Sequence, residues 1–326
     1  MAVERNTQYA IRNTKKKFGR IGVLMGGPST EREISLKSGK AVYESLKQLG
    51  LEVITIDIKT DNIEENVCLM KSYEINCAFL ALHGRFGEDG QIQEVLESLE
   101  IPYTGSGVLA SKLAMDKVAS RKIFGNNGLS VPKYNLLERA SYSVNGKAHN
   151  NLFLPLVIKP ATHGSSIGLS IVDRKEDLRE AVDLAFKFDE RIIIEEYIKG
   201  REVTVGILDD KALPVIEIIP KKRFFDYEAK YQPEMTEYIV PAKLEEEVIK
   251  RIQSSALSAH KLLDCFGCSR VDMILAKDNT PFVLEVNTIP GLTETSLLPK
   301  AAKTVGIEFG ELCLRLIKLA YAKTKV

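Results

Sequence analysis

Strand-length apolar runs alternate with helix-length amphipathic segments near the N-terminus of the chain. Residues 20–25, 53–58 and 77–82 are apolar runs with the length of buried strands. Residues 30–49 and 91–100 repeat apolar side chains at the spacing of a helix. This alternation is typical of a parallel sheet with helices packed on its faces, so we predict an α/β fold for this region.

The first predicted helix has a recognisable start. Thr30 and Glu33 have the spacing of a capping box, in which the two side chains satisfy free backbone amides, so we expect the helix to begin there. Its core side is predicted from the apolar positions Ile34, Ala41, Val42, Leu46 and Leu49. Gly50 is expected to end it.

The remaining chain divides into two further regions. A length of 326 residues suggests at least two domains. We predict a basic extension at 1–19 and domains at 20–114, 115–202 and 203–326. The predicted strands beyond the first domain are 156–160, 169–172, 191–197, 203–208, 213–219, 269–275 and 282–286, the predicted helices are 116–124, 176–188, 244–263 and 309–320, and 224–231 is a loop.

Charge and hydropathy exclude several classes of protein. The 45 basic and 44 acidic residues leave a net charge of +1, which gives no reason to expect a nucleic-acid partner. No apolar run reaches the roughly 18 residues of a membrane helix, so we expect no membrane association. Residues 1–20 are basic but lack the apolar core of a secretory signal.

The five cysteines, Cys68, Cys77, Cys265, Cys268 and Cys313, do not form a metal-binding pattern. Cys265 and Cys268 are the only close pair, and no second pair completes a zinc site. We predict that all five are buried, reduced thiols, which is typical of a cytoplasmic protein.

Polar side chains on two late strands indicate a cation site. Glu285 and Asn287 alternate on one strand and therefore share a face, and Asp272 lies on the preceding strand beside Arg270. Two carboxylates and an amide oxygen suit Mg²⁺ that bridges phosphates. Each residue alone is more often an ordinary strand end, so the prediction depends on the set.

A small polar loop at residues 164–168 is a candidate phosphate site. Successive backbone N–H groups with small side chains form anion-binding nests, and Lys159 ends the strand before the loop. The loop joins two strands and no Gly-Lys-Ser/Thr follows, so it is neither a Walker A loop nor a dinucleotide fingerprint. Taken alone, such a loop is usually just a turn.

Weaker signals accompany this loop. Lys117 lies near a helix start, where a cation is unfavourable against the helix dipole. Glu195, Ile198 and Glu202 lie at a strand end, where they are candidates for reading an adenine and its ribose, although solvated glutamates are an equal alternative. In the first domain, Glu31 and His83 lie at the carboxyl edge of the parallel sheet, where such folds bind ligands.

Seven motifs in one order resemble the D-alanine-D-alanine ligases of the ATP-grasp superfamily. The resemblance extends from residue 20 to residue 321. The motifs are GGPSTEREIS at 26–35, ALHG at 81–84, YTGSG at 103–107, MDK at 115–117, GSSIG at 164–168, DYEAKY at 226–231 and EVNTIPG at 285–291. It implies a three-domain fold with a parallel-sheet N-terminal domain and two α+β domains that enclose ATP.

The resemblance also implies a reaction. ATP phosphorylates one D-alanine, and the amine of a second D-alanine displaces the phosphate to give a dipeptide for peptidoglycan precursors. It further implies a cytoplasmic homodimer and two Mg²⁺ ions, with Mn²⁺ as an alternative. The implied metal ligands are Asp272, Glu285 and Asn287.

The family's functional residues carry over to this sequence position by position. The implied ATP-binding residues are Lys117, Lys159, Ser165, Ser166, Glu195, Ile198 and Glu202. The implied catalytic residues are Glu31, His83, Ser165, Lys230, Tyr231, Arg270 and Gly291. The implied D-alanine contacts are Glu31 and His83 for the first substrate, and Ser296 and Leu297 for the second.

Two alternatives stay open at this point. One is a ligase of the same fold that uses D-lactate or another D-amino acid, which the tyrosine at position 231 argues against within this family. The other is a non-catalytic nucleotide-binding protein, which we expect to have lost a metal or phosphate ligand. A Rossmann-type dehydrogenase is disfavoured, because no G-x-G-x-x-G follows the first strand.

Overall fold

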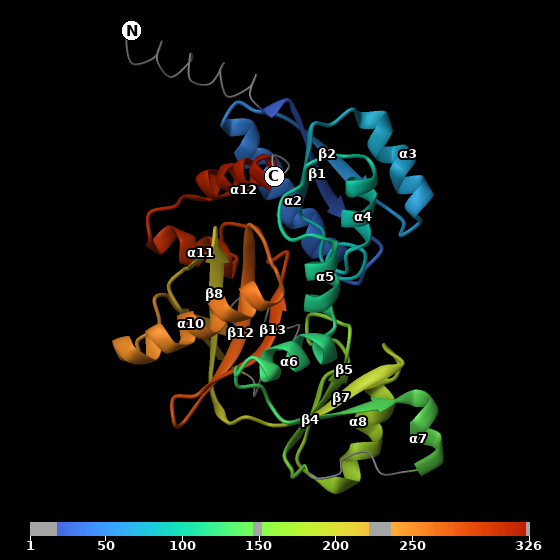
Figure 1. The fold of residues 1–326 in the computed structure, drawn as a ribbon, viewed down its shortest axis with the longest axis vertical. Helices are drawn as coiled ribbons and strands as arrows, with labels where there is room; N and C mark the ends of the chain where they lie inside the picture. Colours follow the sequence, from blue (N-terminus) through green and yellow to red (C-terminus); the bar gives the residue numbers. More distant parts are fainter. Residues whose placement is uncertain (1–17, 146–151, 222–235, 324–326) are drawn as a thin grey trace.

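The computed structural model describes residues 18–145, 152–221 and 236–323. These residues form three sheets with helices packed against them. In Figure 1 a three-stranded sheet lies at one end of the long axis, a four-stranded sheet lies at the other, and a six-stranded sheet lies between them. This arrangement confirms the predicted fold class, while the predicted domain limits stay predictions.

The first sheet is parallel, with strand order β2-β1-β3. Its elements in chain order are β1 (Arg20–Gly26), α2 (Arg32–Gln48), β2 (Glu52–Ile58), α3 (Ile63–Tyr73), β3 (Cys77–Leu80) and α4 (Gln91–Ser98). β3 ends two residues earlier than predicted. The carboxyl ends of β1 and β3 are neighbours, so the segments that follow them are brought together.

The start of α2 differs from the prediction. The helix begins at Arg32, and its N-cap residue is Glu31, which makes no side-chain cap hydrogen bond. The predicted capping box is therefore wrong. The carboxylate of Glu31 instead accepts a hydrogen bond from Ser165, more than a hundred residues away in the chain. The N-cap side chain of α2 thus contacts a distant segment of the chain and not the backbone amides of its own helix.

Helix α2 approaches β1 closely through small residues. Its buried positions are Ser35, Ser38, Gly39, Val42 and Leu46. The predicted core residues Ile34 and Leu49 are instead partly exposed. A side chain at position 39 would place its Cβ 2.5 Å from that of Met25, so only glycine permits this contact. The hydroxyl of Ser35 accepts from the Gly26 amide at 2.8 Å, which fixes the turn after β1.

The second sheet is antiparallel, with order β4-β7-β5-β6. Its elements are β4 (Tyr134–Glu138), α7 (Arg139–Asn145), β5 (Leu156–Pro160), β6 (Ser170–Val172), the 3₁₀ helix η1 (Lys175–Asp177), α8 (Leu178–Ala185) and β7 (Arg191–Glu196). The segment 161–169 joins β5 to the adjacent strand β6, as predicted. This loop therefore begins and ends at the same edge of the sheet.

The third sheet has order β11-β10-β8-β12-β13, with β9 paired to β8. Its strands are β8 (Gly200–Leu208), β9 (Lys211–Ala212), β10 (Ile216–Pro220), β11 (Thr236–Ile239), β12 (Cys268–Ala276) and β13 (Pro281–Asn287). The helices around it are α5 (Val108–Met115), α6 (Lys117–Asn126), α10 (Glu246–Leu262) and α11 (Leu297–Thr304). α6 and α10 share one apolar core with this sheet.

The last helix of the chain returns to the first sheet. α12 (Phe309–Lys323) packs against α2 and β3, and Figure 1 shows it beside α2. One apolar core contains Phe79 of β3, Leu298 of α11 and Leu316 of α12. The first and third sheets are thus joined by a continuous core, which fixes the space between them.

Within the described ranges, no helix is both long enough and apolar enough to span a bilayer. All five cysteines are free thiols. Four are buried as predicted, but Cys68 is exposed. The prediction for Cys68 is wrong because it lies on the outer side of α3, whose buried positions are Asn66 and Met70. Burial raises the pKa of Cys77 to about 12, so that thiol stays protonated.

Candidate functional site

Two cavities meet where the three sheets converge. The larger, of about 400 Å³, lies between the four-stranded and six-stranded sheets, and the smaller, of about 330 Å³, is bordered by the start of α2, the turn after β3 and the start of α11. Both volumes fall within the range of small-molecule sites. The segment 164–168 separates them, since Ser165 lines the smaller cavity and Ser166 lines the larger one.

The larger cavity collects the residues predicted to bind ATP. Its lining includes Lys117, Lys159, Ser166, Glu195, Ile198 and Glu202, together with Asp272 and Glu285. Several isoleucines, including Ile167, Ile171 and Ile218, form the rest of its wall. An apolar slot with charges at one end suits a ligand that has a flat apolar part and an anionic part.

Lys117 reaches this cavity from the first turn of α6. Asp116 caps the helix by accepting hydrogen bonds from the amides of Val118 and Ala119 at 2.9 and 3.0 Å. The carboxylate of Asp116 thus offsets the unfavourable position of a cation at a helix start. The Lys117 ammonium donates to the carbonyl of His163 at 2.6 Å and lies 3.3 Å from the carboxylate of Glu285.

Lys159 belongs to a buried network of charges. Its ammonium lies 2.9 Å from the Glu195 carboxylate, which also pairs with Arg121 of α6. All three side chains are less than a tenth exposed. Burial lowers the pKa of Lys159 to about 8. Burial alone would raise the pKa of Glu195, but the two cations outweigh it and hold that pKa below its usual value.

This network changes the interpretation of Glu195. The sequence resemblance places its carboxylate on the adenine or ribose, yet Arg121 and Lys159 occupy that carboxylate in the structure. Glu195 thus contacts Lys159 and Arg121 and also lines the larger cavity, and its contact with the adenine or ribose stays a prediction. Ile198 and Glu202 line the cavity, and their roles stay predictions.

The loop between the cavities has an unusual backbone. Ser165 and Ser166 have φ values of 54° and 58°, in the left-handed region that non-glycine residues seldom adopt. Gly168 has φ 69° and packs against Phe188. Two turn hydrogen bonds, Ile167 to Gly164 and Leu169 to Ser166, are long at 3.3 Å. The loop thus needs contacts from outside itself to hold this conformation.

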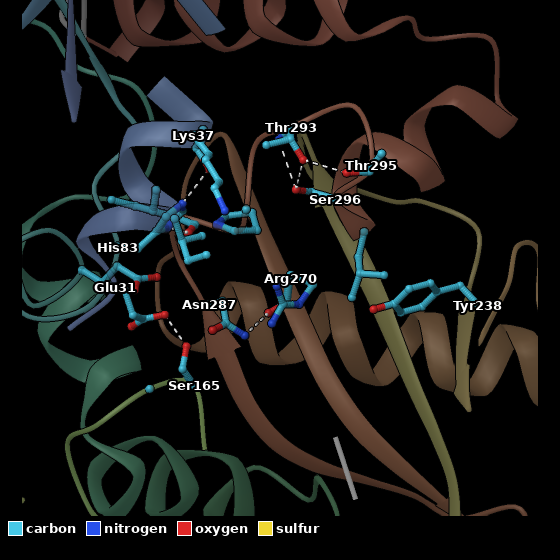
Figure 2. Close-up of a pocket in the computed structure, with 18 residues that line it drawn as sticks. Glu31, Lys37, His83, Ser165, Tyr238, Arg270, Asn287, Thr293, Thr295 and Ser296 are labelled. Atoms are coloured by element: carbon cyan, nitrogen blue, oxygen red, sulfur yellow. Dashed lines mark hydrogen bonds between the residues drawn. The ribbon is translucent and has the colours of Figure 1, made fainter. Parts of the chain in front are cut away.

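Glu31 and His83 lie at one end of the smaller cavity, as Figure 2 shows. His83 is buried, and burial lowers its pKa, so the ring is neutral. Its Nδ1 lies 3.1 Å from the carbonyl oxygen of Ile289, which only accepts, so we assign the proton to Nδ1. Nε2 then accepts from the hydroxyl of Ser38 at 3.0 Å. These two contacts fix the ring beside Glu31.

Glu88 is a cavity residue that the sequence reasoning missed. It lines the smaller cavity and accepts a hydrogen bond from the Gly84 amide at 2.7 Å. Burial raises the pKa of Glu88 to about 8, and the neighbouring Glu31 carboxylate adds to the effect. It follows His83 by five residues, but a lone glutamate in a turn carries no sequence signal.

The sequence reasoning also missed Arg121. Arg121 follows Lys117 by four residues, and this spacing places both side chains on one face of a helix.

Arg270 and Asn287 lie in the middle of the smaller cavity (Figure 2). They are register partners on β12 and β13, and Asp272 and Glu285 are register partners two residues further along the same strands. Arg270 donates to both oxygens of Asp272, at 2.8 and 2.7 Å. The Asn287 amide nitrogen donates to Asp272 at 3.1 Å, which turns its amide oxygen the other way.

The predicted metal ligands are thus neighbours. Asp272, Glu285 and Asn287 present oxygen atoms at the boundary of the two cavities, a donor set that fits a hard divalent cation. Among the residues described, no group of three or more His, Cys, Asp or Glu side chains is arranged to hold a metal. The fit therefore depends on the amide oxygen of Asn287 and on further ligands from a bound phosphate.

The far end of the smaller cavity is formed by the start of α11. Ser296 is its N-cap residue and Leu297 is its first residue. The Ser296 hydroxyl accepts from the Thr293 amide at 3.1 Å, as seen in Figure 2. Gly291 lies close by, since a Cβ at that position would meet the Ser296 hydroxyl at 3.1 Å. Backbone amides at a helix start suit a carboxylate.

Lys230 and Tyr231 fall outside the described residues, so nothing is assigned to them from the structure. Every other predicted site residue lines at least one of the two cavities. Lys117, Ser166 and Glu285 line the larger cavity, while Glu31 and Arg270 line the smaller one. The roles themselves stay predictions.

Comparison with known proteins connects these cavities to one enzyme family. Residues 20–69 and 62–106 match the family described as D-ala D-ala ligase N-terminus, and residues 123–318 match D-ala D-ala ligase C-terminus. A D-alanine–D-alanine ligase of Pelotomaculum thermopropionicum is 46% identical over 310 residues, covering 92% of this chain and 96% of that protein. A D-alanine–D-alanine ligase of Citrifermentans bemidjiense is 48% identical and covers 96% and 99%.

Solved structures agree with the sequence matches. The D-alanine–D-alanine ligase of Bacillus anthracis, in its complex with ATP, superposes with a TM-score of 0.82 at 36% identity and covers 94% of this chain and 98% of that one. The VanG D-Ala:D-Ser ligase of Enterococcus faecalis superposes with a TM-score of 0.79 at 33% identity, covering 93% and 100%.

Proposed function

This chain belongs to the D-alanine–D-alanine ligase family, and we propose that it joins two D-alanines into D-alanyl-D-alanine with the conversion of ATP to ADP and phosphate. The dipeptide serves peptidoglycan precursor synthesis, as in the family. The observation that carries the proposal is the pair of cavities divided by residues 164–168, called the serine loop from here on, with Lys117 and Lys159 lining the larger cavity and Glu31 and Arg270 lining the smaller one. ATP would occupy the larger cavity and the two amino acids the smaller one.

The larger cavity supports binding of the triphosphate. Lys117 at the start of α6 and Lys159 near the end of β5 are buried cations that line this cavity. We assign them to the phosphates, with Ser165 and Ser166 closing over the same groups. Ile198 would contact the adenine through its backbone and Glu202 would bind the ribose. Phosphoryl transfer needs positioning and charge neutralisation more than covalent help from the protein.

The smaller cavity supports binding of the amino acids. Glu31 would hold the ammonium of the first D-alanine, beside the fixed ring of His83. The start of α11 at Ser296 and Leu297 would hold the carboxylate of the second. This order places the carboxylate of the first substrate toward Asn287 and Arg270, near the boundary with the larger cavity.

The chemistry then proceeds in two steps at that boundary. A carboxylate oxygen of the first D-alanine attacks the γ-phosphorus, and ADP leaves. The amine of the second D-alanine attacks the acyl carbon, loses a proton and displaces phosphate. Arg270 and the amide of Gly291 would stabilise the oxyanion, which is worth about 3–4 kcal/mol per donor in comparable sites. Lys230 would assist the transferred phosphate, and Tyr231 would join Glu31 and Ser165.

We propose Mg²⁺ bound by Asp272, Glu285 and Asn287, with two ions at full occupancy and Mn²⁺ as an alternative. A bound cation would supply charge neutralisation at the phosphates. We also propose a cytoplasmic homodimer, which rests on the family alone and is checked by light scattering of the purified chain.

The first experiment measures phosphate release and dipeptide together. Purified protein with ATP and Mg²⁺ should release phosphate only when D-alanine is added, in a one-to-one ratio to D-alanyl-D-alanine measured by chromatography. D-Serine and D-lactate, offered as second substrates, test the specificity. Release without dipeptide, or a product made only with another second substrate, would overturn the assignment of D-alanine.

A variant tests the metal assignment in the same assay. Glu285→Gln keeps the size of the side chain and should abolish turnover while the thermal melting temperature stays near that of the wild type. Glu294→Gln, a neutralised glutamate shortly after the same strand, is the matched control and should retain full activity. Turnover of the Glu285 variant at the wild-type rate would remove this residue from the metal site.

A further inference from the structure

A carboxylate outside both cavities holds Thr162, two residues before the serine loop. The backbone amide and the hydroxyl of Thr162 both donate to Oδ2 of Asp189, at 2.8 and 2.7 Å. The other oxygen, Oδ1, accepts from the backbone amide of Arg191 at 3.0 Å. Asp189 therefore fastens the loop to the start of β7.

The same contacts continue to the helix that carries Lys117. The Arg191 guanidinium donates to Oδ2 of Asp116 at 2.7 Å. Oδ1 of Asp116 is the acceptor that caps α6, through the amides of Val118 and Ala119. One carboxylate thus links β7 to the first turn of α6, immediately beside Lys117.

Lys117 connects this series of contacts, called the contact network from here on, back to the loop. Its ammonium donates to the carbonyl of His163 at 2.6 Å, and its backbone amide donates to the carbonyl of Ala161 at 3.0 Å. The contacts therefore run from Thr162 through Asp189, Arg191 and Asp116 to Lys117 and back to the loop. Apart from Lys117, none of these side chains lines either of the two cavities.

We propose that Asp189, Arg191 and Asp116 are positioning residues that hold the serine loop and Lys117 in one fixed relation for nucleotide binding. Their action is indirect, because the groups they hold are those that face the phosphates. The inference rests on the proposed nucleotide site. It goes beyond it by assigning a function to three charged residues outside the cavity wall.

Two physical arguments support this assignment. The left-handed φ values of Ser165 and Ser166 are costly, so the loop depends on anchors at its ends. Burial alone would raise the pKa of Asp189, but hydrogen bonds from Thr162 and from the Arg191 amide outweigh it and lower that pKa. The carboxylate is therefore ionised at neutral pH, and hydrogen bonds to an ionised acceptor are the stronger kind.

The test uses Thr162→Val, which removes the hydroxyl at nearly constant volume, and Thr162→Ser, which restores it. Asp189→Asn removes the charge of the acceptor. Glu190→Gln is the matched control, since Glu190 is the adjacent surface carboxylate and pairs only with Arg139 among the described side chains. The full chain is assayed for KM of ATP, KM of D-alanine, kcat and the Kd of ADP by calorimetry.

The expected result is selective for the nucleotide. Asp189→Asn should raise the KM of ATP and the Kd of ADP about tenfold, the effect of roughly one lost charge-assisted hydrogen bond. The KM of D-alanine should stay within twofold. Thr162→Val should weaken nucleotide binding in the same way, and Thr162→Ser should restore it. The double variant, Thr162→Val with Asp189→Asn, should lose less affinity than the product of the two single losses.

Different results overturn different statements. Nucleotide constants for Asp189→Asn equal to those of Glu190→Gln would overturn the positioning role. The positioning role would also be overturned if both KM values and the melting temperature changed in parallel and Thr162→Ser did not restore them. The contact network would then be ordinary structural support. If the wild type bound ADP but made no dipeptide, the proposed reaction would be contradicted. The Kd of ADP of the variants, measured by calorimetry, would still decide the role of the contact network.

Discussion

The two cavities differ in how their charges are paired before any ligand arrives. In the larger cavity each lining lysine already has a carboxylate: Lys117 lies beside Glu285, and Lys159 shares Glu195 with Arg121, which lies behind the lining. In the smaller cavity the hydrogen-bond donors to Glu31 and Glu88, within the described part of the chain, are a hydroxyl and backbone amides.

This difference indicates what each cavity has to gain from its ligand. A triphosphate meets lysines that are already held in place, so binding extends an existing network. An ammonium at Glu31 supplies a cationic partner that the described side chains do not provide there. We therefore expect substitutions in the buried network of Lys159, Glu195 and Arg121 to change stability as well as nucleotide binding. Substitutions in the smaller cavity should change substrate binding alone.

The strongest test of this comparison is Arg121→Met. The substitution leaves Glu195 buried with Lys159 as the one cation still paired with it among the described side chains. Removing one member of a buried ion pair typically costs about 3–5 kcal/mol, and we expect the free energy of unfolding to fall by that amount. The measurement is the urea unfolding curve at pH 7.

The control for Arg121→Met is an ion pair at the surface. Arg20 and Glu52 make a 2.8 Å pair whose side chains are 40% and 55% exposed. Arg20→Met should therefore cost less than about 1 kcal/mol. If the two substitutions destabilise the protein equally, the network in the larger cavity is not structural and the comparison fails.

The next effect is expected from Glu31→Gln. The glutamine keeps an oxygen for the Ser165 hydroxyl but removes the charge that would meet the ammonium. A charge-assisted hydrogen bond contributes about 1.5–3 kcal/mol, so the KM of D-alanine at the first site should rise roughly 10–150-fold. The Kd of ADP and the urea midpoint should not change.

Glu33→Gln is the matched control for this substitution. Glu33 lies on the same turn of α2, but it is exposed and lines neither cavity. Its substitution should leave both substrate constants unchanged. A Glu31 variant whose nucleotide binding weakens as much as its D-alanine binding would show that the two cavities do not act separately.

The sequence predicted the fold well where the apolar pattern had one cause. The strands of the parallel sheet and the long helix α10 follow from strand-length apolar runs and from helical spacing. Helices α3, α5, α7 and α11 were not predicted. α3 buries little more than Asn66 and Met70, so its apolar pattern is weak. α11 is short and contains Pro299, and it packs against the strand β8, which is distant in the sequence.

The site was predictable through residue types, but not through pairings. The resemblance supplied residues that line the two cavities, but it did not indicate that the carboxylate of Glu195 pairs with Arg121. The capping box failed for a similar reason. The side chain of Glu31 bonds to Ser165, which is close only in the folded chain. Contacts between distant segments decide such cases, and local sequence patterns do not contain them.

The smallest effect expected is a pH dependence of ADP binding that comes from Lys159 of the larger cavity. Burial lowers the pKa of Lys159 to about 8, so this lysine loses its proton as the pH rises through 8, whereas an exposed lysine does so near 10.4. The charged form is the one that binds phosphate. ADP affinity should therefore fall about tenfold between pH 7 and pH 9, as the protonated fraction falls.

The control for this pH dependence is Lys159→Arg, which keeps its charge throughout this range. Its affinity at pH 7 should be lower than that of the wild type, because the guanidinium does not reproduce the ammonium contact with Glu195, but its pH profile should be flat. Calorimetry at constant ionic strength measures both profiles. Equal slopes in the two proteins would assign the pH dependence to the nucleotide or to another group, and would remove Lys159 from the phosphate site.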